Sequence, residues 1–259
     1  MTDRPQTVLV VGATGSVGRY AVAEALRQGL TVRVLVRNSS RARTLPAEAV
    51  RFVGDLTRPE TLKAAVEGAD AVVFTHGSST SEPDVREIDY GGVRNILSAL
   101  GGRPARIALM SVIGATRRGS GYAEWKRRSE RLVRASGNRY TIVRPGWFDY
   151  NSPDQRTIVM LQGDTRQSGS PADGVIARDE IARVLIDSLS TDAADHRTFE
   201  LVSEHGPEQD DLAPVFAALA ADPAGSLDAA EDADNLPLDG EPAEVRRDLE
   251  EVTAAHLKQ

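Results

Sequence analysis

Two side chains suited to proton transfer stand four residues apart in "GYAEWK", residues 121–126. The chain has 31 basic residues but only three lysines, and one of these, Lys126, follows Tyr122 at that spacing. On a helix, a spacing of four puts both side chains on one face. A phenol, with a pKa of about 10, is a poor base at neutral pH, and an ammonium group held close to it favours the phenolate. The pair therefore predicts general acid–base chemistry.

A glycine-rich loop near the N-terminus predicts a phosphate-binding turn. Gly12, Gly15 and Gly18 lie between an apolar run and a helix-period segment in residues 8–26. In such a loop the first glycine permits a tight turn, the second lets the backbone approach a pyrophosphate, and the third permits close helix packing. The helix N-terminus adds free N–H groups and a partial positive charge. The predicted dinucleotide contacts of this loop are Gly12, Thr14, Gly15, Ser16, Val17 and Gly18.

The second predicted strand ends in a cation, Arg37. An NAD site usually has an acidic residue there, which accepts hydrogen bonds from the ribose hydroxyls. A guanidinium instead matches a 2′-phosphate, so NADP(H) is favoured over NAD(H), unless Arg37 merely faces solvent. After the third strand, Asp55 is a candidate for binding the adenine amino group, with Leu56 against the ring. Asp55 could equally cap the helix that begins near Pro59.

These residues need an alternating βα framework to bring them together. Short runs rich in valine and isoleucine alternate with helix-period segments, which is typical of strands buried on both faces. Such alternation predicts right-handed βαβ crossovers and an α/β fold, a doubly wound parallel sheet of the Rossmann type. The predicted strands are 7–13, 31–37, 49–55, 70–77, 105–112 and 139–146, and the predicted helices are 16–29, 59–68, 84–102 and 121–137.

The pattern loosens after residue 145, where we expect a small C-terminal substrate lobe. Two further strands, 157–163 and 198–204, flank a helix at 178–190, and another helix is predicted at 210–221. We predict a dinucleotide-binding domain over 1–204, which includes part of the lobe, and a C-terminal helical extension over 205–259. Within that extension, residues 222–241 hold seven acidic residues and no basic one, which predicts an extended or partly ordered linker.

In the last predicted helix, Val245, Leu249, Val252 and Leu257 could line one face. We expect this face to dock on the body of the protein, and a homodimer contact is the alternative.

Composition limits the choice of partners. The chain has 259 residues, a formal net charge of −7 and no cysteine. Without the acidic segment the body is roughly neutral, so nucleic acid is not an expected partner. There is no apolar run of membrane-spanning length, and the histidines lack metal-ligand spacing. We expect a soluble, cytoplasmic protein that acts on a small molecule.

Taken together, the motifs resemble the short-chain dehydrogenase/reductase superfamily, in the form of its atypical NmrA-like, NAD(P)H-binding members. The resemblance covers residues 7 to about 204. It rests on "GATGSVG", "GDL", "DYGGVRNILSAL", "LMSV", "YAEWK" and "VRPGWF", which occur in the superfamily's order.

The resemblance implies that Tyr122, Lys126 and Ser111 match the superfamily's catalytic residues. Ser111 would bind the substrate oxygen, Lys126 would also reach the nicotinamide ribose, and Tyr122 would transfer the proton as hydride moves. This implies an NADP(H)-dependent oxidoreductase acting on a small carbonyl/alcohol pair. A non-catalytic NADP-binding redox sensor and a nucleotide-sugar epimerase or isomerase are the alternatives.

The resemblance also extends the predicted site. His76 could be a second acid–base group or a hydrogen-bonded loop residue. Asp89 stands where many superfamily members have an asparagine, which puts a proton relay through that position in doubt, and Asn95 is expected to brace the sheet. Arg178 and Asp179 are interpreted as structural. The remaining predicted contacts are Thr75, His76, Gly77, Pro145 and Gly146 with the cofactor, and Trp147 and Phe148, unless they pack under the lobe, with the substrate. Asp149, Tyr150 and Asn151 are further candidates for facing that pocket.

Overall fold

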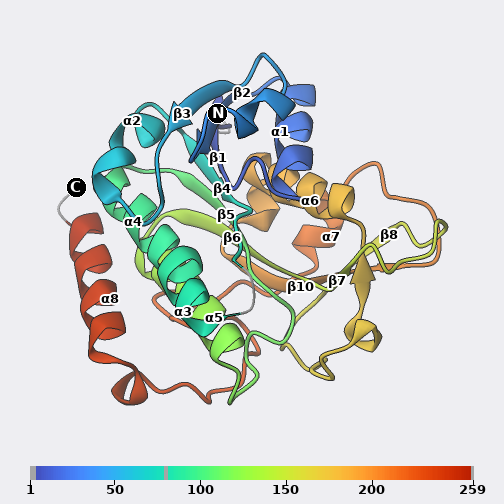
Figure 1. The fold of residues 1–259 in the computed structure, drawn as a ribbon. Coiled ribbons are helices and arrows are strands. Elements are labelled where there is room, and N and C mark those ends of the chain that lie inside the picture. The colour runs from blue at the N-terminus through green and yellow to red at the C-terminus, as the bar shows by residue number, and fades with distance from the viewer. Residues whose placement is uncertain (1–3, 79–80, 258–259) are drawn as a thin grey trace.

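The computed structural model describes residues 4–78 and 81–257. Its strands are β1 (Thr7–Val11), β2 (Thr31–Val36), β3 (Val50–Val53), β4 (Ala71–Phe74), β5 (Arg106–Met110), β6 (Arg139–Pro145), β7 (Trp147–Phe148), β8 (Thr157–Leu161), β9 (Val175–Ile176) and β10 (Arg197–Glu204). Eight of these strands form one sheet in the order β3-β2-β1-β4-β5-β6-β10-β8 (Figure 1). Seven are parallel, and β8 runs antiparallel to β10. The predicted doubly wound sheet is confirmed.

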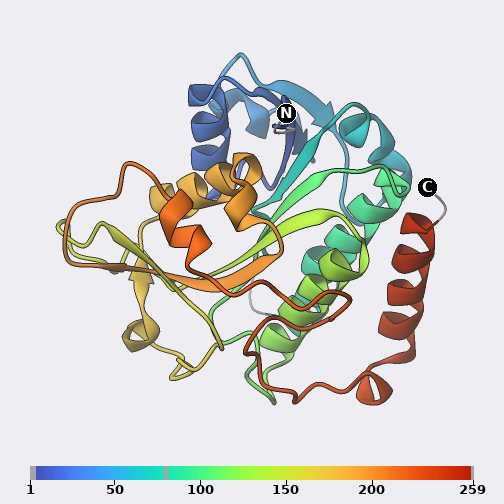
Figure 2. The same cartoon turned by 180° about the vertical axis from the view of Figure 1, so that it is seen from behind.

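Helices cover both faces of this sheet. They are α1 (Gly18–Arg27), α2 (Lys63–Val66), α3 (Glu82–Asp84), α4 (Gly91–Leu100), α5 (Gly121–Ala135), α6 (Arg178–Ser190), α7 (Ala213–Ala217) and α8 (Ala243–His256). In β1, Val8 and Val10 pack in one core with α1 and α6, while Leu9 and Val11 pack in a second core with α4 and α5. Figures 1 and 2 show these layers from opposite sides. Among the described residues, no helix is long and apolar enough to cross a membrane.

The strand order reverses between β1 and β4. At such a switch point the connections leave the sheet in opposite directions, which opens a crevice at the carboxyl ends of the strands. The glycine loop follows β1 and Thr75 follows β4, so both segments lie at this crevice.

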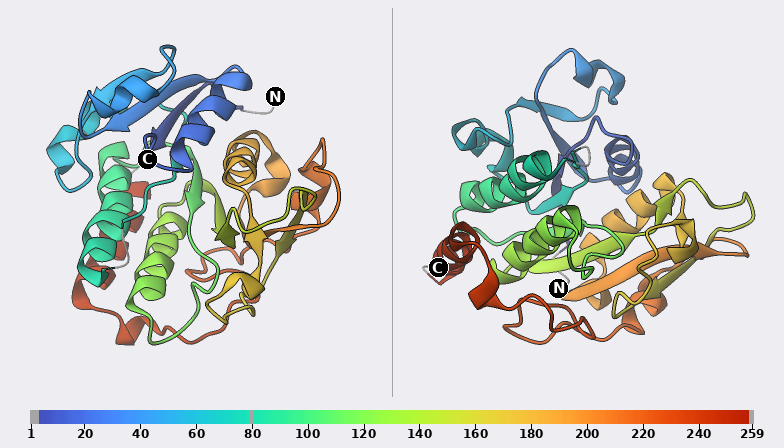
Figure 3. Two further views of the ribbon diagram at one scale, coloured as in Figure 1. Left: turned by 45° about the vertical axis from the view of Figure 1, so that its right-hand side comes forward. Right: turned by 60° about the horizontal axis from the view of Figure 1, so that its bottom comes forward.

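Helix α8 docks on the body, as the apolar pattern predicted. Val245, Leu249 and Val252 are buried against α4 and α5, and Figure 3 shows the helix beside them. Leu257 does not join this face, because it lies at the end of the helix and is 77% exposed.

Three predicted helices are shorter or less regular than expected. The segment 59–68 forms a single turn followed by α2, and the segment 84–102 consists of α3, a π-helical stretch at Val85–Tyr90, and α4. The segment 210–221 contains only α7, which buries Phe216 alone. A helix with so small an apolar face gains little from tertiary packing, and short helices are marginal without it.

The predicted linker at 222–241, which we call the C-terminal strap, lies against the body and buries some of its side chains there, although much of it is exposed. Its backbone is irregular and crosses α5 (Figure 2). Its carboxylates pair with arginines of that helix. Glu241 lies 2.7 Å from Arg128 Nε and 3.0 Å from Arg131 Nη1, and none of these side chains is more than 8% exposed. Buried charges need partners, so the strap and the arginines depend on each other. The other pairs on α5 are Arg127–Asp228, Arg131–Asp228 and Arg134–Asp222, and the strap also pairs Asp232 with Arg144 of β6.

Candidate active site

A cavity of about 1180 Å³ lies at the carboxyl ends of the parallel strands. It extends from the glycine loop, past the ends of β2 to β6, to the first turns of α5. The carboxyl ends of parallel strands meet at one edge of a sheet, which is why residues far apart in the sequence converge here. The predicted residues that line it are Gly12, Thr14, Gly15, Ser16, Val17, Arg37, Asp55, Leu56, Thr75, His76, Gly77, Ser111, Tyr122, Lys126, Pro145, Gly146, Trp147 and Phe148.

Gly18 is the predicted residue that does not line the cavity, because it packs beneath the loop. A Cβ atom on Gly18 would lie 2.1 Å from the carbonyl oxygen of Gly12. Gly12 itself has a φ of +88°, and a Cβ there would lie 2.5 Å from the backbone nitrogen of His76. The first and third glycines therefore serve close packing of the loop.

The first turn of α1 is open to a phosphate group. Its N-cap, Val17, makes no side-chain hydrogen bond to the helix, and no acidic residue lies in the first turn. The N–H groups at a helix start need partners, and a phosphate oxygen supplies them. This part of the cavity fits the pyrophosphate of a dinucleotide.

Arg37 and Asp55 line the cavity near the ends of β2 and β3. Asp55 accepts hydrogen bonds from the backbone N and the hydroxyl of Thr57, at 3.0 and 2.9 Å. The Thr57 backbone bond is the main cause of a lowered pKa of Asp55, and the charge of Arg37 contributes. The helical turn at residue 59 has no side-chain cap, so Asp55 closes a local turn instead of capping it. Asn95 donates to the Leu56 carbonyl at 2.7 Å and so braces the same loop.

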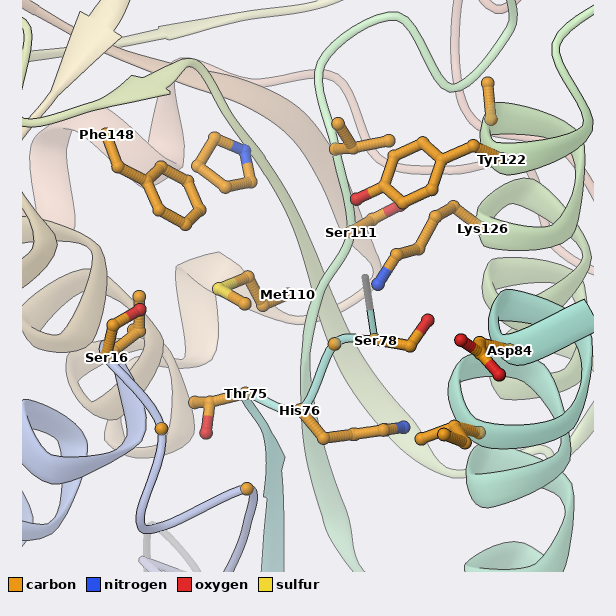
Figure 4. Close-up of a pocket in the computed structure, with 18 of the residues that line it drawn as sticks. Ser16, Thr75, His76, Ser78, Asp84, Met110, Ser111, Tyr122, Lys126 and Phe148 are labelled. Atoms are coloured by element: carbon orange, nitrogen blue, oxygen red, sulfur yellow. The ribbon is translucent and has the colours of Figure 1, made fainter. Parts of the chain in front are cut away.

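Tyr122 and Lys126 lie on one side of the cavity, on consecutive turns of α5 (Figure 4). The Nζ atom of Lys126 is 5.8 Å from the centre of the Tyr122 ring. The same Nζ lies 2.7 Å from Asp89 Oδ2, and both side chains of this pair are at most 6% exposed. The departure from the asparagine pattern therefore gives Lys126 a buried counter-ion.

Ser111 follows β5 and is buried at the cavity wall. Its backbone N donates to the Val143 carbonyl at 2.7 Å, which fixes the residue beside β6. Its hydroxyl donates to Glu130 Oε1 at 2.6 Å. Glu130 was not among the predicted site residues, although it follows Tyr122 and Lys126 at the same spacing of four on α5. That repeat is the signal that could have identified it.

His76 is a buried, neutral loop residue. Burial is the main cause that lowers its pKa to about 4, the charge of Lys126 lowers it further, and Asp89 opposes both effects. Its Nε2 lies 3.2 Å from the Asp89 carbonyl oxygen and so acts as the donor. The interpretation as a hydrogen-bonded loop residue agrees with this geometry.

Aromatic residues form the outer wall. Trp147 and Tyr150 are 36% and 63% exposed and meet edge to face at 5.9 Å, and Phe148 lies across the cavity from Tyr122 (Figure 4). A short two-stranded sheet, β7 with β9, holds this wall in place, since Trp147 N donates to the Gly174 carbonyl at 2.9 Å. The stretch around Trp147 is therefore fixed by backbone bonds.

Arg178, which the sequence suggests is structural, also lines the cavity. Its guanidinium lies over the Phe148 ring at 5.1 Å and pairs with Asp149. Asp179 pairs with Arg156 at 2.8 Å and is structural, as expected. The position of Arg178 at the start of α6 does not by itself show that its side chain reaches the cavity. Its placement depends on β9 and on the loop that precedes β9.

Comparison with known proteins shows the family. The model of an NAD(P)H-binding family matches residues 12–192, which include the glycine loop and the Tyr122–Lys126 pair. A photosystem II assembly factor of Cyanophora paradoxa is 27% identical over 83% of this chain and 68% of its own length. An NAD(P)H azoreductase of Xenophilus azovorans is 27% identical over 83% of this chain and 73% of its own. A Bacillus halodurans structure provisionally assigned as an NAD-dependent epimerase/dehydratase has a TM-score of 0.69 at 25% identity, covering 83% of this chain and 100% of that one.

Proposed function

Because the chain belongs to this NAD(P)H-binding family, we propose that it is an NADP(H)-dependent oxidoreductase acting on a small carbonyl compound and its alcohol. One observation carries the proposal. The glycine loop and the Tyr122–Lys126 pair line a single cavity, so a bound dinucleotide and an acid–base pair would share one space. A non-catalytic sensor would need the glycine loop, but it would not need this pair on the cavity wall.

The residues of the cavity fit the dinucleotide. The uncapped start of α1 would hold the pyrophosphate, and the exposed Arg37 would hold a 2′-phosphate. The preference for NADP(H) rests on this guanidinium. When bound, the cofactor supplies or accepts the hydride.

Tyr122 performs the proton transfer in this proposal. Its hydroxyl donates the proton to the carbonyl oxygen during reduction and becomes a phenolate, and in oxidation the phenolate accepts the proton from the alcohol. Such catalysis contributes about 10²–10⁴-fold in rate. Lys126 supplies the positive charge beside Tyr122, and its ion pair with Asp89 holds the ammonium group in place. Trp147 and Phe148 would cover an apolar substrate and limit the access of water.

The test is the rate of NADPH oxidation with a panel of small aldehydes and ketones. We expect turnover by the wild type and a fall of about 10²-fold or more in kcat for Tyr122→Phe. Tyr20→Phe is the matched control, because Tyr20 is exposed on α1 and does not line the cavity. Equal rates in the two variants would remove Tyr122 from the mechanism.

A further inference from the structure

The hydroxyl proton of Ser111 is committed to a buried carboxylate. The Ser111 Oγ–Glu130 Oε1 distance of 2.6 Å is typical of an O–H donor and an ionised acceptor. Ser111 also lines the active-site cavity, as does Tyr122, and in the view of Figure 4 its side chain lies behind the Tyr122 ring. The direction of this hydrogen bond therefore affects what Ser111 can offer a substrate.

Glu130 is held in its ionised form. Burial alone would raise the pKa of Glu130, but the charge and hydrogen bonds of Arg144 outweigh it and leave the pKa lowered. Arg144 donates to both Glu130 oxygens, at 3.0 and 2.7 Å, and Arg134 lies 3.4 Å from Oε2. Arg144 is itself fixed by two bonds to Asp232 of the C-terminal strap, at 2.7 and 2.8 Å.

An ionised carboxylate can only accept hydrogen bonds, so Ser111 must be the donor to Glu130. A serine hydroxyl has one proton and two lone pairs. With its proton turned toward Glu130, Ser111 presents only lone pairs to the cavity. It can accept a hydrogen bond from a substrate, but it cannot donate one to a carbonyl oxygen.

We propose that Glu130 is a positioning residue that fixes Ser111 Oγ as an acceptor, so that the site selects substrates with an O–H or N–H donor beside the reacting carbon. This inference rests on the proposed function. Within that function, Tyr122 alone donates the proton to the carbonyl oxygen. Ser111 accepts a hydrogen bond from the O–H or N–H group beside the reacting carbon.

The orientation is tested first by proton NMR of protein carrying ¹³C-labelled serine, which requires no substrate. We expect one slowly exchanging hydroxyl proton that correlates with the Ser111 side chain and disappears in Ser111→Ala. A Ser111 hydroxyl that exchanges as fast as that of an exposed serine would overturn the proposal.

The selectivity is tested with acetoin and 2-butanone, which differ by a hydroxyl group next to the carbonyl. The ratio of their kcat/KM values should fall about 10-fold in Ser111→Ala, because one hydrogen bond to the extra hydroxyl is lost. An unchanged ratio in Ser111→Ala contradicts the proposal.

A second variant tests the role of Glu130. In Glu130→Gln the side-chain amide can donate a hydrogen bond to Ser111 Oγ, which leaves the Ser111 hydroxyl proton free to point into the cavity. The ratio of kcat/KM for acetoin to that for 2-butanone should therefore fall. NADPH binding by this variant reports whether it has folded, and Ser111→Ala leaves the charged network intact. If the wild type reduces neither compound, the proposed function fails for this substrate class, while the NMR result still decides the orientation.

Discussion

The buried ion pairs of the C-terminal strap predict a large loss of thermal stability when one carboxylate is removed. Glu241→Gln removes a carboxylate that is 0% exposed and leaves two guanidinium groups, those of Arg128 and Arg131, without their shared counter-ion. Breaking a buried ion pair from one side costs about 3–5 kcal/mol, and only partial compensation remains here, from Asp228 beside Arg131 and from Glu124 at 3.5 Å from Arg128. At about 2–4 °C per kcal/mol for a chain of this size, Tm should fall by roughly 6–20 °C.

Thermal unfolding followed by circular dichroism measures this change. Asp234→Asn is the matched control, because it removes the same charge from an exposed position of the strap. We expect the control to shift the free energy of unfolding by less than about 0.5 kcal/mol. Equal Tm values for the two variants would refute the reasoning, since the strap would then be a solvated linker.

Three further predictions concern pH, the cavity wall and the glycine loop. Burial raises the pKa of Glu200 from 4.5 to about 7, so its contribution to stability is present below pH 4.5 and is lost as the pH rises through 7. The Tm of the wild type minus that of Glu200→Gln should therefore fall between pH 5 and pH 8, and a flat difference would contradict the shift. Trp147→Ala should raise the KM of an apolar carbonyl substrate about 10-fold while the Kd of NADPH, from fluorescence titration, changes less than about 3-fold; equal changes would place Trp147 at the cofactor. Gly12→Ala should cost about 2–4 kcal/mol in urea unfolding because of its φ and the contact with His76, whereas Gly29→Ala, with a φ of +81° and open space, should cost about 1 kcal/mol.

The sequence predicts the sheet and the cavity well for a physical reason. Strands buried on both faces are continuously apolar, and the loops after parallel strands converge at one edge. Gly12 could therefore be assigned from its place between a predicted strand and helix, and Tyr122 from its spacing to Lys126, while the family resemblance added Ser111 to the same site. The structure places all three in the cavity wall.

The ion pairs of the strap and the roles of Arg178 and Glu130 in the site could not be predicted in the same way. Arg128 and Glu241 are 113 residues apart, and a charged residue does not indicate its partner through periodicity. Arg178 reaches the cavity only because β9 and Asp149 place it there. Glu130 follows a visible spacing, but its meaning depends on Ser111 lying on the adjacent strand end.

Fluorescence titration of the purified protein with NADPH and with NADH tests the central claim most directly. We expect NADPH to bind at least about 10-fold more tightly than NADH, because Arg37 would pair with the 2′-phosphate. Arg37→Asp should abolish this difference, while Arg103→Asp, an equal charge change outside the cavity, should preserve it. No binding of either cofactor would contradict the assignment of the cavity as a dinucleotide site, and with it the proposed oxidoreductase function.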